Sequence, residues 1–296
     1  MASGASKASQ AANDASLSSL PNDDAPDIDA ILERARGLER EGCFDEAAAL
    51  LSERLNYDAR IADLSYRLAS IRIKQDRLPE AEEHLQQALR VRFEDARVHT
   101  NLGVVLDRQG RSAEAIRAFR RAIQLAPRES TAHLNLGALY GELGRYEDAI
   151  RSLRRCLELR PGFDAYFNLA LVYFRRGELL PAEQSFRDAL SYDDEQALCH
   201  LYLGQCYFRR GVMNDAVEAF AMALALEPQL ARARYYRGMA LNKLNRYGAA
   251  VEDLQRAAKA LADDGRVHYQ LGIAYDGLSL KSEARASYRR ARTLAG

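Results

Sequence analysis

Residues Thr100–Phe119 read TNLGVVLDRQGRSAEAIRAF, and residues Leu134–Leu153 read LNLGALYGELGRYEDAIRSL, which is nearly the same phrase 34 residues later. The alanine inside these phrases recurs along most of the chain. It stands at Ala47, Ala81, Ala115, Ala149, Ala182, Ala216, Ala250 and Ala284. The steps are 34, 34, 34, 33, 34, 34 and 34 residues, so eight copies of one unit run from about Ile28 to the end. A fixed period of this length predicts a repeat architecture.

Each repeat carries the pattern of two helices. With the recurring alanine numbered as position 20, apolar residues at positions 4, 7, 8 and 11 and again at 20, 24, 27 and 28 have helical spacing. Glycine near position 15 ends the first helix. Proline at position 32, present as Pro127, Pro161 and Pro228, ends the second. The sequence therefore predicts a stack of helical hairpins, because one hairpin cannot bury its own apolar face.

Position 8 predicts a close approach of helices. It is glycine in five repeats, each time in the middle of the expected first helix, where glycine costs about 1 kcal/mol relative to alanine. These glycines are Gly103, Gly137, Gly204, Gly238 and Gly272, and the other repeats have Ala35, Ala69 and Ala170. We expect tight helix packing at this small position to offset the cost.

These residues resemble the tetratricopeptide repeat, whose period is 34. Repeat four shows the pattern well, with His133, Leu136, Gly137, Tyr140, Ala149, Leu153, Cys156 and Pro161. Repeats one and two depart from it most, since Arg34 and Arg72 replace the usual Leu and Tyr. The resemblance implies an all-α fold, an α-solenoid in which antiparallel helix pairs stack into a right-handed superhelix. We expect residues 27–296 to form one such solenoid.

Composition narrows the class of protein. Residues 1–26 are rich in Ser, Ala and Asp, which predicts a disordered tail. Lys plus Arg and Asp plus Glu both number 42, so a general nucleic-acid binder is not indicated. No apolar run has the length of a membrane span or a secretory signal, which favours a cytoplasmic protein. The scattered cysteines Cys43, Cys156, Cys199 and Cys206 predict reduced, buried thiols.

The sequence offers no pattern typical of an enzyme. His99, His133, His200 and His268 all occupy position 4 of different repeats, so they are spread along the stack and a structural role is favoured over a metal site. The acidic runs 193–195 and 263–264 fall at repeat boundaries, where they predict helix N-caps. Phosphate-binding loops, nucleophile elbows and zinc-protease motifs are absent from the sequence. We expect neither catalysis nor a cofactor.

The resemblance also implies that the first helix of each hairpin lines a concave groove. Position 6 in that groove is Asn in three successive repeats, Asn101, Asn135 and Asn168. An asparagine amide offers a donor and an acceptor, which match a peptide bond. This column resembles the asparagine ladder of the O-linked N-acetylglucosamine transferases, although a tolerated polar residue is the alternative. The candidate aromatic anchors of a bound segment are Phe167, Phe174, Tyr202, Phe208, Tyr235 and Tyr236.

Position 13 adds a column of basic residues, among them Arg108, Arg175 and Arg209, which could meet acidic or phosphorylated groups. Solvated charge at a helix end is the alternative interpretation. Position 5 has no Lys in any repeat, so the carboxylate clamp of chaperone-binding members is absent.

The sequence therefore predicts a non-enzymatic scaffold that binds an extended segment of a protein partner in the groove. Three alternatives stay open. The first is a module that self-associates into a homo-oligomer. The second is an accessory or regulatory subunit of an enzyme or of a secretion or assembly complex, in which residues 1–26 could occupy the groove, and the third is RNA binding, which the neutral charge balance disfavours.

Overall fold

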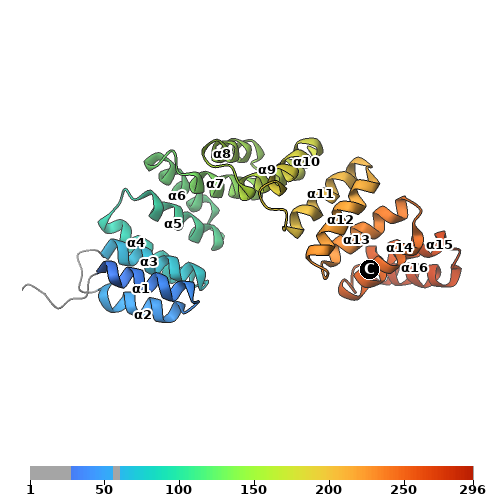
Figure 1. The fold of residues 1–296 in the computed structure, drawn as a ribbon, viewed down its shortest axis with the longest axis horizontal. Helices are drawn as coiled ribbons and strands as arrows, with labels where there is room; N and C mark the ends of the chain where they lie inside the picture. Colours follow the sequence, from blue (N-terminus) through green and yellow to red (C-terminus); the bar gives the residue numbers. More distant parts are fainter. Residues whose placement is uncertain (1–27, 56–60, 296) are drawn as a thin grey trace, which may run out of the picture. The chain divides into compact units, whose positions relative to one another are not determined.

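A computed structural model describes residues 28–55 and 61–295, and the tail predicted for residues 1–26 lies outside them. The described residues form sixteen α-helices and no strand (Figure 1). The helices are α1 Ile28–Arg40, α2 Phe44–Leu55, α3 Ile61–Lys74, α4 Leu78–Val91, α5 Ala96–Arg108, α6 Ser112–Leu125, α7 Ser130–Glu142, α8 Tyr146–Leu159, α9 Phe163–Arg176, α10 Leu179–Leu190, α11 Ala197–Arg210, α12 Met213–Leu226, α13 Ala231–Lys243, α14 Tyr247–Ala260, α15 Gly265–Gly277 and α16 Lys281–Ala295. The predicted all-α class is confirmed.

The chain divides into two compact units between Phe93 and Glu94. Unit 1 contains α1 to α4, which are the two repeats that depart most from the repeat pattern. Unit 2 contains α5 to α16, which are repeats three to eight. In both units the two helices of a repeat pack against each other, and the second helix of one repeat packs on the first helix of the next. The α-solenoid class is thereby confirmed, while one continuous solenoid over residues 27–296 stays a prediction.

Helix boundaries repeat with the sequence. The second helix begins at position 17 in every described repeat, and the first begins at position 1 in all but the second repeat. The helices that precede Pro127, Pro161 and Pro228 each end two residues before the proline, as predicted.

The turn inside each hairpin has one geometry throughout. A residue with positive φ occupies position 15 in all eight repeats, and the backbone N–H of position 16 donates to the carbonyl of position 11, which is the Schellman arrangement. Five of the position-15 residues are glycine. The other three are Asp76 with φ 60°, Asn245 with φ 55° and Ser279 with φ 61°. The turn therefore demands a left-handed residue even where the sequence supplies no glycine.

We predict that Ser279→Gly stabilises the protein by about 0.5–1 kcal/mol, because glycine removes the strain of a left-handed side chain. Ser287→Gly, in the middle of α16, is the matched control and should destabilise, since glycine is a poor helix former. Thermal unfolding followed by circular dichroism measures both. Equal shifts of the same sign would contradict the assignment of strain to position 15.

The position-8 glycines lie where the two helices of a hairpin come closest. A Cβ atom on Gly103 would stand 2.5 Å from the ring of Phe119, and one on Gly204 would stand 2.6 Å from the ring of Phe220. The same close approach occurs at Gly137 beside Leu153, and again at Gly238 and Gly272. In each case the facing side chain belongs to position 24 of the same repeat. The predicted tight packing is confirmed.

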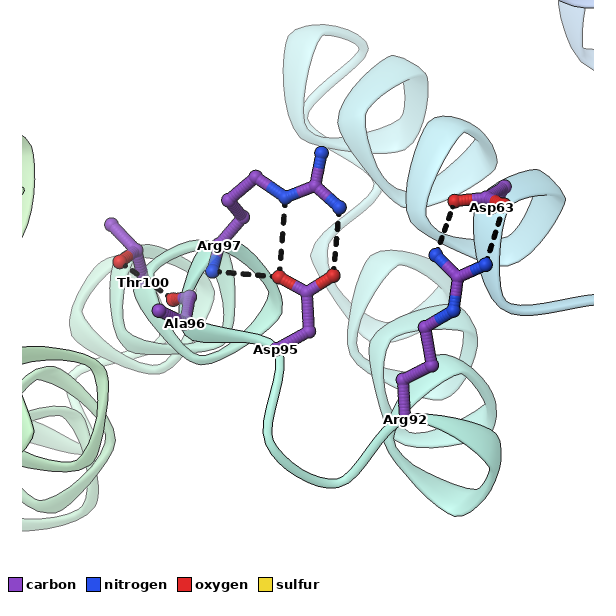
Figure 2. Close-up of polar contacts among 6 residues, drawn as sticks. All are labelled: Asp63, Arg92, Asp95, Ala96, Arg97 and Thr100. Carbon is purple, nitrogen blue, oxygen red and sulfur yellow. Dashed lines mark hydrogen bonds and ion pairs between the residues drawn. The ribbon is translucent and has the colours of Figure 1, made fainter. Parts of the chain in front are cut away.

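Polar contacts fix the ends of helices in both units (Figure 2). In unit 1 the Arg92 guanidinium donates to both carboxylate oxygens of Asp63, at 2.6 and 2.8 Å, which ties the end of α4 to α3. In unit 2 Asp95 is the N-cap of α5 and accepts from the backbone N–H of Arg97 at 3.0 Å. Hydrogen bonds from Arg97 hold the pKa of Asp95 below its usual value, so this cap stays ionised near neutral pH.

Candidate functional site

The candidate site lies on the layer of unit 2 formed by the first helices of its repeats, here called the odd-helix layer: α5, α7, α9, α11, α13 and α15. Within it α5 packs on α7, α7 on α9, α11 on α13 and α13 on α15. Consecutive even-numbered helices make no comparable contacts in the described part of the chain. Because the odd-numbered helices are the more closely spaced, they form the inner side of unit 2.

All twelve predicted site residues belong to this layer, and each is half-buried or exposed. They are Asn101 and Arg108 on α5, Asn135 on α7, Phe167, Asn168, Phe174 and Arg175 on α9, Tyr202, Phe208 and Arg209 on α11, and Tyr235 and Tyr236 on α13. The structure thus places them on one layer of helices, and their part in ligand binding stays a prediction.

Tyr202 is the centre of an aromatic cluster between α9 and α11. Its ring stacks on Phe186 with centroids 5.9 Å apart and receives the edges of Phe167 and Phe174 at 6.2 and 5.7 Å. One repeat later Tyr236 stacks on Phe220 at 5.8 Å and meets Phe208 at 6.4 Å. These rings therefore hold neighbouring repeats together as well as facing the surface.

The two clusters follow a rule that sequence reasoning missed. The residue at position 12 of one repeat contacts position 6 of the next, 28 residues later. Phe174 pairs with Tyr202, Phe208 with Tyr236, and Asn242 donates to the backbone carbonyl of Gln270 at 3.0 Å. In unit 1 the carboxylate of Glu39 lies 2.6 Å from Arg67. Aromatic, amide and ionic pairs thus fill the same place, so position 6 is largely a junction position.

This side-chain pairing is missing at Asn168. The residue at position 12 of the preceding repeat is Gly141, which has no side chain that could contact Asn168. The Asn168 amide nitrogen instead donates to the carbonyl of Asp164 on its own helix, at 2.8 Å. Opposite Asn135 is Asp107, whose pKa is raised by burial and by the nearby charge of Glu142.

The position-13 arginines cap the preceding repeat. Arg175 donates to the carbonyl of Gly141 at 3.3 Å, and Arg209 donates to that of Phe174 at 3.4 Å. The Arg209 guanidinium also lies 5.0 Å from the centre of the Phe174 ring. Both side chains are exposed, so they retain donors for a ligand while neutralising the carboxyl end of a helix. Arg108 is likewise exposed.

A pocket of about 1160 Å³ at the last hairpin was not predicted. Its lining includes Tyr235 of α13, Arg266 and Tyr269 of α15, and Tyr288 of α16. Burial raises the pKa of Tyr235, and burial together with the hydrogen bond to Asp276 raises the pKa of Tyr288 to about 12. The sequence feature that could have indicated this pocket is the tyrosine at position 5 in both of the last two repeats.

Two of the position-4 histidines contact the loop that precedes their own helix. The His200 ring nitrogen lies 2.9 Å from the carbonyl of Asp194, and that of His133 lies 3.2 Å from the carbonyl of Pro127. Residues 28–55 and 61–295 contain no group of three or more His, Cys, Asp or Glu side chains arranged to hold a metal ion.

The two acidic runs differ in whether they cap the helix that follows them. Asp264 caps α15 by accepting from the backbone N–H of Arg266 at 3.0 Å, as predicted. The prediction was wrong for run 193–195, because Gln196 is the N-cap residue of α11 and Asp193 accepts from the N–H of Glu195 within the loop.

The thiols are poor nucleophiles where they are deeply buried. Burial raises the pKa of Cys199 and of Cys206 to about 12, and it also raises the pKa of Cys156. Cys43 is only half-buried, in contrast to the prediction, because it lies at the turn between α1 and α2. No helix in the described ranges is both long and apolar enough to cross a bilayer.

Several solved structures share the fold. PilF of Pseudomonas aeruginosa is 18% identical over 70% of this chain and 94% of its own, with a TM-score of 0.63. A chain of the APC/C hetero-tetramer Cut9–Hcn1 is 19% identical over 89% of this chain and 52% of its own, with a TM-score of 0.60. YrrB, described as a TPR protein with an unusual peptide-binding site, is 20% identical over 63% of this chain and 96% of its own, with a TM-score of 0.55.

Sequence matches give the family. No curated protein matches the chain. Family models described as tetratricopeptide repeat match residues 59–128, 96–162, 163–196, 181–231 and 214–266. These matches, the eight-fold period and the stacked hairpins agree, and the chain belongs to the tetratricopeptide repeat family.

Proposed function

We propose that this protein is a non-enzymatic interaction scaffold that binds an extended segment of a partner protein along the odd-helix layer of unit 2. The family and the fold support the coarse part of this proposal, since stacked hairpins present a long surface rather than an enclosed pocket. The peptide-binding site named for YrrB supports the finer part by analogy of fold alone.

The observation that carries the proposal is the position of Asn135 and Asn168. At Tyr202, Tyr236 and Gln270 position 6 is engaged by the side chain at position 12 of the preceding repeat, whereas Gly141 leaves Asn168 without such a partner. Its hydrogen bond to Asp164 uses the amide nitrogen, which leaves the amide oxygen for a peptide N–H. Two such amides on neighbouring helices would hold a peptide backbone regardless of its side chains.

Aromatic and basic residues supply the remaining affinity. Two or three hydrogen bonds contribute about 0.5–1.5 kcal/mol each, well short of the roughly 8 kcal/mol of micromolar binding. Phe167 and Tyr202 add partly exposed rings that are already fixed by their neighbours, so little side-chain entropy is lost on binding. Arg175 and Arg209 add donors for carboxylates at the edge of the layer.

The test uses a phage-displayed library of twelve-residue peptides, from which binders to the full chain are selected and measured by fluorescence anisotropy. Asn135→Ala with Asn168→Ala should weaken them roughly fivefold to 150-fold, because two hydrogen bonds are worth about 1–3 kcal/mol together. Helicity should stay unchanged, since both residues are partly exposed. Asn214→Ala, at an exposed position of α12, is the matched control. Equal affinity for the wild type and the double variant would exclude the asparagine contacts.

A further inference from the structure

A recurring hydrogen bond ties an even-numbered helix to the odd-numbered helix that follows it. At three junctions of unit 2 the residue at position 25 donates to the tyrosine hydroxyl at position 11 of the following repeat. These bonds are Arg154 to Tyr173 at 3.0 Å, Arg187 to Tyr207 at 2.7 Å and Gln255 to Tyr275 at 2.8 Å. The tie thus occurs at three of the five junctions between the repeats of unit 2.

The junction of α6 and α7 has the same two residues without the bond. Here position 25 is Arg120 and position 11 is Tyr140, yet no hydrogen bond between them is found in the described part of the chain. Instead both line a groove of about 820 Å³ between α6 and α8, floored by α7. This volume is within the range of ligand pockets, about 300–1,000 Å³.

The floor of the groove is apolar. It contains Ile123 of α6, Leu136 and Tyr140 of α7 and Ile150 of α8. The Arg145 guanidinium lies 4.4 Å from the centre of the Tyr140 ring and fixes its position. Leu136, Tyr140 and Ile150 are nearly buried, at 4%, 3% and 7% exposure, so only small parts of these side chains face the groove, next to the half-buried Ile123. An apolar side chain of a ligand could contact this floor chiefly through Ile123 and the edges of the other three residues.

The walls carry uncompensated positive charge. Each acidic residue of the groove has its own arginine partner. Asp148 lies 2.5 Å from Arg145, Glu147 lies 2.8 Å from Arg176, and Glu158 lies 2.8 Å from Arg155.

Two arginines remain for a ligand. Arg151 is 3.7 Å from Asp148 with a side chain that is 79% exposed, so this contact is weak. Arg120 is exposed at the opposite wall. The groove thus pairs an apolar floor with cationic walls, which is complementary to carboxylates that flank an apolar residue.

We propose that the groove between α6 and α8 is a second docking site, which binds a short acidic segment of a partner protein. One leucine or phenylalanine of the segment lies on Ile123, Leu136 and Ile150, while its carboxylates accept from Arg120 and Arg151. The Tyr140 hydroxyl donates to one of these carboxylates. The equivalent tyrosine hydroxyls at two other junctions, those of Tyr173 and Tyr207, accept from an arginine instead. The site lies on the even-helix side and goes beyond the proposed binding on the odd-helix layer.

The test uses an array of ten-residue peptides with one central phenylalanine or leucine among aspartates and glutamates, followed by anisotropy with fluorescein-labelled members. We expect saturable binding to the full chain. The peptide whose central residue is alanine should bind at least tenfold more weakly, since it cannot use the apolar floor. Absence of any binder, or equal binding of the alanine peptide, would overturn the proposal.

Variants locate the site. Arg120→Gln with Arg151→Gln should weaken binding at least tenfold, whereas Arg117→Gln with Arg128→Gln, which removes the same charge from exposed positions outside the groove, should stay within twofold. Equal losses in both double variants would show general charge attraction, as for RNA or any polyanion, and would overturn the proposal. Asn135→Ala with Asn168→Ala should leave this binding unchanged, so failure here is distinguishable from failure of the proposed function.

Discussion

Replacing Phe220 with alanine is expected to lower the free energy of unfolding by about 3–5 kcal/mol. The Phe220 ring is fully buried in α12. It packs where Gly204 lets α11 approach and stacks beneath Tyr236 of the next repeat. Its removal would leave a cavity shared by three helices. Because the rigid backbone at Gly204 has no side chain to fill that space, little relaxation can offset the loss.

Urea unfolding followed by far-ultraviolet circular dichroism measures this change. Met222→Ala is the matched control on the same helix, since Met222 is 50% exposed and its truncation should stay within about 0.5 kcal/mol. A Phe220→Ala effect below about 1 kcal/mol would mean that the helices close over the gap, contrary to the packing described here.

Breaking the ion pair of Arg237 and Asp253 is expected to cost about 3 kcal/mol, at the lower end of the range for buried pairs. The Arg237 guanidinium donates to both carboxylate oxygens of Asp253, at 2.6 and 2.7 Å, and joins α13 to α14. The Asp253 side chain is only 6% exposed, so Arg237→Met leaves a carboxylate with little access to water. Arg234 lies 4.0 Å away and compensates only in part.

The double variant Arg237→Met with Asp253→Leu should recover most of this stability, because two apolar residues replace both charges. The four proteins form a double-mutant cycle, measured by urea unfolding. Additive effects of the single variants would contradict the view that the cost comes from an unpaired carboxylate.

Much of the fold could be predicted because the 34-residue period is directly visible in the sequence. Alanine at position 20 fixed the register, and glycine at position 8 predicted where helices would approach. The left-handed turns at Asp76, Asn245 and Ser279 could not be predicted from residue type, since none is glycine. Only their place in the period indicates them. The boundary at Phe93 was not predicted either, because repeats one and two keep the period while losing parts of the pattern.

The candidate site was predicted as a surface but not as a set of contacts. The position of Asn168, Tyr202 and Tyr236 within the repeat placed them on the odd-helix layer, because helical spacing alone decides which side of a helix a residue occupies. It missed that Tyr202 and Tyr236 are engaged by phenylalanines of the preceding repeat. That interaction joins residues 28 positions apart and becomes visible only when position 12 is compared with position 6 of the next repeat.

The pairing of positions 12 and 6 restricts how such a gene could grow or shrink. Loss of repeat six would set Phe174 against Tyr236, again a phenylalanine facing a tyrosine, so the new pair at positions 12 and 6 would match the old one. Loss of repeat seven would set Phe208 against Gln270, a ring facing an amide. Unequal recombination that removes repeat six would therefore preserve this contact, whereas removal of repeat seven would disrupt it. The repeats share one period, but they are not interchangeable in order.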